Sequence, residues 1–477
     1  MAGAITGAAG QPALTPSASK ATLPTNYITD FNFLNQYLPD TYEREFERYG
    51  NRSINAFLRM VGAEMPTNSD LIKWEEQGRL HTQYTGVTAT VPLVAGVQQF
   101  DIAAGVCNFR VGQTVMLSSA TDNKLIKGVV TEIAGGSGAP NPTEFKVAPY
   151  ENGAAFTAVT DIVAYVYGSE FRKGTNGMVG SLEADPVIFD NKPIIIKDKY
   201  VVAGSDMAQI GWVEVTSENG ADGYLWYIKS EHETRLRYDD YLEMAMIEGV
   251  PAETGSAAAT ALNSAAYPAG STLAQSAGTQ GLFDSIENRG NVWSGGNPTA
   301  LADFDAIIQR LDKQGAIQEN VLFVNRQMGF DIDDMLAAQN SYGAGGTSYG
   351  LFDNDEEMAL NLGFSGFKRG YEFYKSDWKY LNDATLRGGI TAGQVNGVLV
   401  PAGSTNVYDQ VMGKNARRPF LHVRYRASET EDRRYKTWIT GSAGGAATSD
   451  LDAMEVNFLS ERARCTLGAN NLFIFKS

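Results

Sequence analysis

One long helical stretch, DGYLWYIKSEHETRLRYDDYLEMAMIEG at Asp222–Gly249, constrains the fold more than any other part of the sequence. Asp222 is expected to cap its start and Gly249 to end it. At about 1.5 Å per residue the helix is roughly 40 Å long, so it needs a broad partner surface. The strand-rich sequence around it predicts a sheet packed along the helix. Apolar and aromatic residues recur at helical spacing and form one stripe, namely Leu225, Ile228, Leu236, Tyr238, Leu242, Ala245 and Met246.

Bulk composition limits the class of protein. The chain has 477 residues, 43% hydrophobic and 20% charged, which is typical of a folded globular protein of about three domains. A net charge of −16 argues against a dedicated nucleic-acid binder, because such binding needs Lys and Arg to neutralise phosphates. Cys107 and Cys465 lie far apart, and we expect both to be reduced thiols. The sequence shows no signal peptide and no membrane-length apolar run, so we expect a soluble protein made inside a cell.

Residues 1–80 predict an N-terminal arm with short helices. Residues 1–30 are rich in Ala, Gly, Ser, Thr and Pro and carry almost no charge, which is typical of an extended arm that becomes ordered on a partner. Asp40 followed by Glu43 has the spacing of a capping box and predicts a helix at about 40–49. Further helices are expected at 53–62 and at 69–77, where Gly78 would end the last one.

Residues 81–220 predict a long β excursion. Between about 84 and 168, short β-type runs such as QQFDIAAG and DIVAYVYG alternate with turn residues at close spacing, which predicts an inserted small all-β barrel or sandwich. PIIIKDKYVVAG and QIGWVEV are later strand candidates, joined by a turn at Gly204–Asp206. The base of the excursion is therefore expected near 80 and near 200.

The second half of the chain predicts an α+β fold. Residues 221–297 are expected to hold the long helix and a connection rich in small and polar residues. Residues 298–400 predict a compact α+β domain, since an amphipathic helix at about 299–314 is followed by the strand NVLFVN and the helix RQMGFDIDDMLAAQ. Residues 401–477 supply returning strands, among them PFLHVRYRAS, RRYKTWITG, MEVNFLSERARCTLG and NLFIFK.

The sequence contains one candidate for a catalytic serine. Gly346–Gly350 reads G-T-S-Y-G, the serine pattern of many hydrolases, but no strand precedes Ser348 as a nucleophile elbow requires. His422 follows in the chain order of a catalytic triad, although it lies in an alternating strand pattern. A serine hydrolase using Ser348 and His422 is therefore a third hypothesis. His81 and His232 are expected to be ordinary hydrogen-bonded histidines.

No metal or cofactor site is predicted. Asp353–Glu357 resembles the start of a calcium loop, but Met358 and Phe364 stand where Gly and Glu are needed. A solvated acidic turn is expected there, with a weak surface cation site as the alternative. Gly343–Gly345 lacks the third glycine of a dinucleotide fingerprint, and Gly413–Lys414 lacks the rest of a phosphate loop. We therefore assign no catalytic, cofactor-binding or metal-binding residues.

A basic cluster stands out against the acidic chain. Two interpretations remain open. The cluster forms an ordinary charged strand surface, or it contacts acidic neighbouring subunits or nucleic acid. The acidic residues within the same stretch are Glu429, Glu431 and Asp432. The basic residues are Lys414, Arg417, Arg418, Arg424, Arg426, Arg433, Arg434 and Lys436.

The order of these parts resembles the major capsid proteins of tailed bacteriophages with the Hong Kong 97-type fold. An uncharged arm, a β excursion, one long helix, a compact α+β domain and closing strands follow one another as the N-arm, E-loop, P-domain spine helix, A-domain and returning P-domain strands do in that family. The stretches SDLIKWEEQGRLH, KPIIIKDKYVVAGSDMAQIGW, RRPFLHVRYRASETEDRRYKTWITG and TLGANNLFIFK are similar to capsid proteins of podovirus-type phages of the crAss-like group.

The resemblance implies a structural virion protein that is not an enzyme. Such a protein self-assembles into homo-pentamers and homo-hexamers of an icosahedral capsid shell and is made in the bacterial host cytoplasm. Its partners would be the portal, auxiliary capsid proteins and, through non-specific contact, packaged DNA, with no membrane and no cofactor. The β module would be an insertion domain in the E-loop. The alternative is a minor or decorating virion protein whose β module binds a partner.

Overall fold

The computed structural model describes residues 62–79, 81–102, 106–134, 143–157, 159–179, 186–208, 215–216, 222–223, 226–262, 278–315, 317–339, 365–402, 404–409, 414–445 and 447–477. The helices expected at 40–49 and 53–62 lie outside these ranges, except that Gly62 begins a strand. The described fold is mixed α+β. The chain divides into two compact units, Trp74–Phe189 and the remainder. Within the described ranges, no helix is both long and apolar enough to span a membrane.

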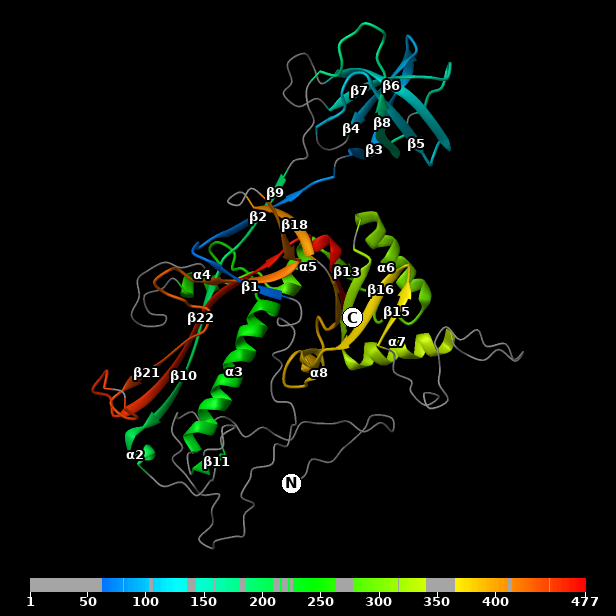
Figure 1. Ribbon diagram of the computed structural model, residues 1–477. Coiled ribbons are helices and arrows are strands. Elements are labelled where there is room, and N and C mark those ends of the chain that lie inside the picture. The colour runs from blue at the N-terminus through cyan, green and yellow to red at the C-terminus, as the bar shows by residue number, and fades with distance from the viewer. Residues whose placement is uncertain are drawn as a thin grey trace. The chain divides into compact units, whose positions relative to one another are not determined.

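The unit Trp74–Phe189 contains a closed antiparallel barrel (Figure 1). Its strands alternate inward apolar residues with outward polar ones, and Phe100, Phe145 and Phe156 pack together in the core. Closing the sheet leaves no free edge, which stabilises a small all-β unit. The barrel order is β3-β4-β7-β6-β5-β8, with β3 at Gln83–Val94, β4 at Val97–Ile102, β5 at Gln113–Ser119, β6 at Lys124–Ala134, β7 at Glu144–Pro149 and β8 at Ile162–Ser169.

The chain enters and leaves this unit through a two-stranded ribbon. Strand β2 (Ile72–Gln77) pairs with β9 (Pro186–Asn191), and the rings of Trp74 and Phe189 lie 6.4 Å apart. The helix predicted at 69–77 is therefore wrong. Its residues alternate in burial as a strand does, from buried Ile72 to exposed Lys73.

A carboxylate ties two loops of the barrel together, and this gives a pH-dependent prediction. Asp161 accepts hydrogen bonds from the Ser119 hydroxyl (2.6 Å) and the N–H groups of Ala120 (3.0 Å) and Thr121 (2.9 Å). The Ser119 bond, followed by the Thr121 bond, lowers the pKa of Asp161 to about 2. The stabilisation is full above the ordinary pKa of 3.8 and is lost as the pH falls towards 2.

We therefore expect Asp161→Asn to lower the melting temperature of the barrel at neutral pH, because the amide keeps only one acceptor oxygen. The difference from wild type should shrink steadily as the pH falls from about 4 to about 2. Differential scanning calorimetry of the full chain over this pH series measures it. A difference that stays constant below pH 4 would contradict the proposed role of the ionised carboxylate.

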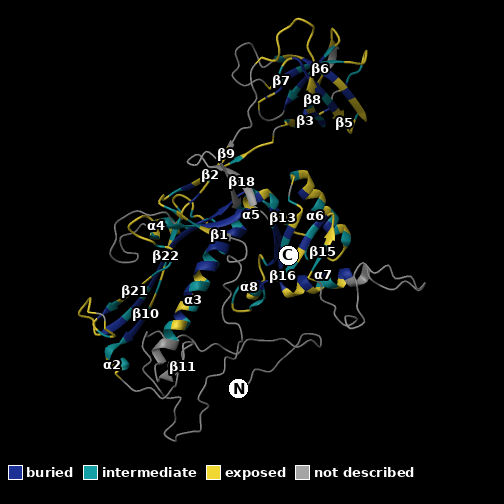
Figure 2. Cartoon of the chain, viewed as in Figure 1, coloured by how far each residue is buried: buried dark blue, intermediate teal, exposed yellow. Residues whose placement is uncertain are grey.

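The second unit contains an elongated sheet with the long helix along one face. The central strand β22 (Ala453–Thr466) pairs with β10 (Ile194–Ala203) on one side and with β20 (Leu421–Arg426) and β21 (Lys436–Gly441) on the other. Strand β1 (Gly62–Thr67) pairs in parallel with β20. Helix α3 (Trp226–Glu248) packs on this sheet, which confirms the predicted helix-on-sheet arrangement. Figure 2 shows the buried positions along β22 and towards the C-terminal end of α3.

The start of α3 differs from the prediction. Asp222 does not cap the helix, because Asp222–Gly223 forms β12, which pairs with β11 (Val215–Thr216). Along the helix, Tyr238, Leu242 and Met246 of the predicted stripe are buried, and Ile247 joins them. The turn predicted at Gly204–Asp206 is part of a short helix, α2 (Gly204–Met207). A further short helix, α4, spans Ala257–Leu262.

A six-stranded mixed sheet forms the second body of this unit. Its order is β13-β23-β17-β14-β16-β15. It draws strands from both ends of the second half of the chain, and these sequence-distant strands lie side by side in hydrogen-bonded pairs. The strands are β13 (Asn291–Trp293), β14 (Glu319–Val324), β15 (Gly366–Arg369), β16 (Tyr371–Asp377), β17 (Val395–Pro401) and β23 (Phe473–Lys476).

Helices cover both faces of this sheet. On one face, Leu322 and Leu399 point into a core where they pack against residues of α6 (Leu301–Gln314) and α7 (Arg326–Gln339). Phe323 and Val398, one position along, point into the opposite core, with α5 (Leu282–Arg289), α8 (Lys379–Asn382) and the end of α3. This alternation explains why β17 is buried along its whole length. The remaining elements are η3 (Arg387–Gly389), η4 (Ala469–Asn471) and the hairpin β18 (Ser404–Asp409) with β19 (Lys414–Pro419).

Candidate functional site

The basic cluster is organised on the sheet formed by β1, β20, β22 and β21. Strand β20 supplies Arg424 and Arg426, and the turn before β21 supplies Arg433 and Arg434. The backbone of β19 places Lys414, Arg417 and Arg418 in the separate hairpin. The sheet thus gathers arginines from both sides of a turn beside the edge strand β1.

Acidic residues of the same chain meet these arginines. Glu64 on β1 accepts a hydrogen bond from Nε of Arg434, and its other oxygen lies 3.5 Å from Nη1 of Arg462 on β22. Nη2 of Arg426 binds the carboxylate of Asp70, and its Nη1 donates to the carbonyl of Asn68 (2.7 Å). The cluster therefore holds the segment Gly62–Asp70.

A buried carboxylate completes the network. Glu461 on β22, 7% exposed in its side chain, lies 3.2 Å from Nε of Arg426 and 3.1 Å from Nε of Arg433. Lys436 pairs with Glu431 at 2.8 Å. Arg426, Arg433, Arg434 and Lys436 thus each have an acidic partner within the chain, which leaves less charge for phosphate. The arrangement favours a charged strand surface over a nucleic-acid contact at these four residues.

A fully buried arginine joins the two bodies of the second unit. Arg464 on β22 donates to the carbonyl of Met246 (3.3 Å), to Oγ of Ser285 (3.4 Å) and to Oγ1 of Thr466 (2.6 Å). Burial lowers the pKa of Arg464 to about 9. Met246 is in the last turn of α3, where carbonyl groups lack partners within the helix. Arg464 therefore fixes the end of α3 against α5 and β22.

Asn191, where β9 ends, is a second buried polar junction. Its Nδ2 donates to the carbonyls of Arg464 (2.6 Å) and Gln280 (3.1 Å), and its Oδ1 accepts from Oγ1 of Thr279 (3.1 Å) and from N–H of Gln280 (2.8 Å). One amide thus ties three segments together that are distant in sequence. Such a satisfied network specifies one arrangement of the chain.

A third junction lies at the last residue of α3. The carboxylate of Glu248 accepts a hydrogen bond from the Tyr380 hydroxyl (2.7 Å) and one from Nη1 of Arg387 (3.3 Å). Burial, and then the Glu248 hydrogen bond, raises the pKa of Tyr380. The guanidinium of Arg387 also lies 5.5 Å above the ring of Phe283 on α5. These contacts hold α8 and η3 against the helix end.

The other sequence candidates do not form a reactive site in the described residues. His81 is exposed in a bend and His232 is exposed on α3. His422 is buried in β20, with Nδ1 3.3 Å from the carbonyl of Pro419. Ser348 lies outside the described residues, as do Gly343–Gly345 and Asp353–Glu357. Among the residues that are described, no group of three or more His, Cys, Asp or Glu could hold a metal ion.

Both cysteines are buried as free thiols, Cys107 in the barrel core and Cys465 on β22. Burial raises the pKa of both, that of Cys465 to about 11, so neither is held as a reactive thiolate.

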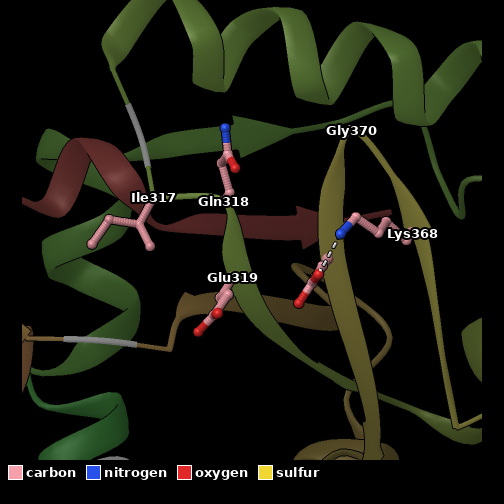
Figure 3. A pocket seen from close by; sticks show the side chains of 6 residues that line it. Ile317, Gln318, Glu319, Lys368 and Gly370 are labelled. Atoms are coloured by element: carbon pink, nitrogen blue, oxygen red, sulfur yellow. Dashed lines mark hydrogen bonds and ion pairs between the residues drawn. The ribbon is translucent and has the colours of Figure 1, made fainter.

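A hollow of about 410 Å³ lies beside the turn between β15 and β16 (Figure 3). Lys368 and Glu372 form an ion pair there, 2.6 Å long, which raises the pKa of Lys368 and lowers that of Glu372. Its lining contains no serine, threonine, cysteine or histidine, and Lys368 is already paired with Glu372. The lining residues are Ile317, Gln318, Glu319, Lys368, Gly370 and Glu372.

Comparison with known proteins gives distant structural likenesses only. No family profile matches the sequence. No curated protein matches it either. Among solved structures, the chain is similar to the capsid of the native GTA particle (TM-score 0.37, 10% identity, 92% of this chain and 96% of that one). A chain of Microbacterium phage Oxtober96 gives TM-score 0.35 and 10% identity, over 91% of this chain and 95% of that one. The bacteriophage PhiM1 mature capsid gives TM-score 0.31 and 12% identity, over 65% of this chain and 78% of that one.

Proposed function

We propose that the protein is the major shell-forming subunit of a tailed-phage head and has a structural, non-enzymatic role. One observation carries the proposal. The chain combines an elongated body, in which the 23-residue helix α3 lies on the long strands β10 and β22, with a compact body in which helices cover both faces of a mixed sheet. These two bodies fit the P-domain and A-domain expected for a Hong Kong 97-type capsid protein.

The other parts of the chain fit the same proposal. The barrel of strands β3 to β8 is connected through the β2–β9 ribbon and would be an insertion domain of the E-loop. Residues 1–80 would be the N-arm. In this proposal the subunit forms pentamers and hexamers in the icosahedral virion shell and is made in the host cytoplasm. The portal, auxiliary capsid proteins and packaged DNA would be its partners.

The junctions at Arg464 and Asn191, which are buried, and at Glu248, which is half-buried, support a role in which the two bodies of the subunit keep a fixed relation. Each connects α3 or β22 to a distant segment through directional hydrogen bonds. A shell subunit must keep its two bodies in a defined relation while its outer loops adapt to neighbours. Junctions of this kind hold such a relation without requiring an apolar interface over the whole length.

Assembly of the purified protein tests the proposal. The protein is expressed alone and with its neighbouring virion proteins, and is examined by negative-stain electron microscopy and light scattering. Closed shells, or rings of five and six subunits, are the expected result. A stable monomer under every condition would reject a self-sufficient shell-forming role.

The second candidate is a minor or decorating virion protein whose barrel binds a partner. Tyr150, Tyr165 and Tyr167 on the barrel are 52%, 38% and 46% exposed, and tyrosine is enriched at protein interfaces. Copy number in purified particles separates the two candidates, because a shell subunit is present in hundreds of copies. The hydrolase hypothesis is disfavoured by the burial of His422 in β20, and labelling by a serine-reactive probe tests it directly.

A further inference from the structure

Strand β1 is attached to its sheet with little burial of apolar surface. It pairs in parallel with β20, from Gly62 opposite Leu421 to Thr67 opposite Arg426. None of its described side chains is buried, since Glu64 and Pro66 are exposed and Met65 and Thr67 are half-buried. Pro66 also brings no backbone N–H to the ladder. The hydrophobic effect therefore contributes little to holding this strand.

Charged contacts hold the strand in addition to its backbone pairing with β20. Glu64 contacts Arg434 and Arg462, and Asp70 contacts Arg426. Arginines also bind the backbone of the segment, because Nη1 of Arg424 donates to the carbonyl of Pro66 (3.3 Å) and Nη1 of Arg426 donates to that of Asn68. Four arginine side chains therefore contact the nine-residue segment Gly62–Asp70, which contains two acidic residues. They are Arg424, Arg426, Arg434 and Arg462.

These pairs differ in their access to solvent. The side chains of Asp70 and Arg434 are 88% and 55% exposed, whereas that of Arg462 is 7% exposed. Exposed pairs are screened by dissolved ions, and buried ones much less. Raising the salt concentration should therefore weaken the ion pairs Arg434–Glu64 and Arg426–Asp70 more than the pair Arg462–Glu64.

We propose that the segment Gly62–Asp70 is a releasable edge strand, held by an electrostatic clasp whose strength is set by ionic strength. At low salt the clasp keeps β1 on β20. At high salt β1 detaches from β20 more often. Detachment exposes the backbone edge of β20, which can then pair with another strand. This inference does not depend on the proposed shell-forming role.

Hydrogen exchange of the intact full chain, read by mass spectrometry, tests the clasp. Exchange is compared at about 0.1 M and about 1 M NaCl, which shortens the Debye length from roughly 10 Å to roughly 3 Å. We expect peptides covering Gly62–Thr67 to exchange about tenfold faster at high salt, an effect within what the loss of two exposed ion pairs produces. Peptides from the buried strand β17 should be unchanged. Salt-independent exchange in β1 would overturn the proposal.

A pair of matched variants separates the clasp from a general effect of salt. Glu64→Gln removes the charge that faces Arg434 and Arg462, so β1 should exchange faster at low salt and respond less to added salt. Glu455→Gln is the control, because Glu455 pairs with Lys199 on the same sheet but does not contact β1. Equal effects of the two variants on β1 exchange would reject the clasp. If Glu64→Gln does not fold, the salt series on the wild type still decides.

Discussion

Replacing Gly281 by alanine is expected to destabilise the second unit by about 3 kcal/mol, because the new methyl group has no room. A Cβ at this position would lie 2.6 Å from the backbone nitrogen of Gly249 and 2.6 Å from the carbonyl oxygen of Ile247. Both are backbone atoms at the end of α3, so they cannot move aside as a flexible side chain could. The N–H of Gly281 also donates to the carbonyl of Gly249 (2.7 Å), a bond that displacement would break.

The backbone conformation of Gly281, with φ of −87°, suits any L-residue, so the predicted loss comes from the close approach alone. Gly329→Ala in α7 is the matched control. There the nearest atom to a new Cβ is a methyl of Val324 at 3.7 Å, and alanine is a better helix former than glycine. Urea unfolding followed by tryptophan fluorescence measures both. A Gly281→Ala variant as stable as Gly329→Ala would show that the junction of α3 and α5 is looser than described.

The periodicity of hydrophobic residues was enough to predict those helices and strands whose pattern lies within their own residues. The stripe from Tyr238 to Met246 predicted α3 and its packing on a sheet, because an amphipathic helix of that length needs a broad apolar partner. The strands β20, β22 and β23 were also recognisable as apolar or alternating runs. In each case the pattern that predicts the element is contained within the element itself.

Elements that depend on a distant partner could not be predicted in the same way. The run IKWEEQ contains good helix formers, yet it forms β2 because β9, more than a hundred residues later, pairs with it. Asp222 looked like a helix cap, but pairing with Thr216 placed it in a strand. Local propensity is worth only tenths of a kcal/mol per residue, so tertiary pairing outweighs it.

In the candidate site, too, the ion-pair partners that are distant in sequence could not be predicted. The density of basic residues from Lys414 to Lys436 was visible in the sequence, but not the carboxylates that meet them. Glu64 and Asp70 precede their arginine partners by more than 350 residues. In β22, the charged residues Glu461, Arg462 and Arg464 alternate with or adjoin buried apolar residues such as Ala463 and Cys465, and this mixture is a local signal that charged groups are buried there.

Arg464→Ala is expected to cost about 4 kcal/mol of unfolding free energy, the second large effect. The truncation leaves a cavity where one of the largest fully buried side chains stood. It also leaves the carbonyl of Met246 without its arginine donor, at a helix end where a positive group is favourable. The hydroxyls of Ser285 and Thr466 lose a partner as well.

The variant Arg464→Met separates the cost of the cavity from the cost of the lost hydrogen bonds. Methionine fills much of the volume and removes the desolvation that lowers the pKa of Arg464, but it donates no hydrogen bond. We expect Arg464→Met to fall within about 1–2 kcal/mol of wild type, because a buried charge replaced by an apolar side chain of similar length is often nearly neutral. Arg434→Ala is the exposed control and should cost less than about 1 kcal/mol. If Arg464→Ala costs no more than Arg434→Ala in urea unfolding, the buried guanidinium does not secure the end of α3.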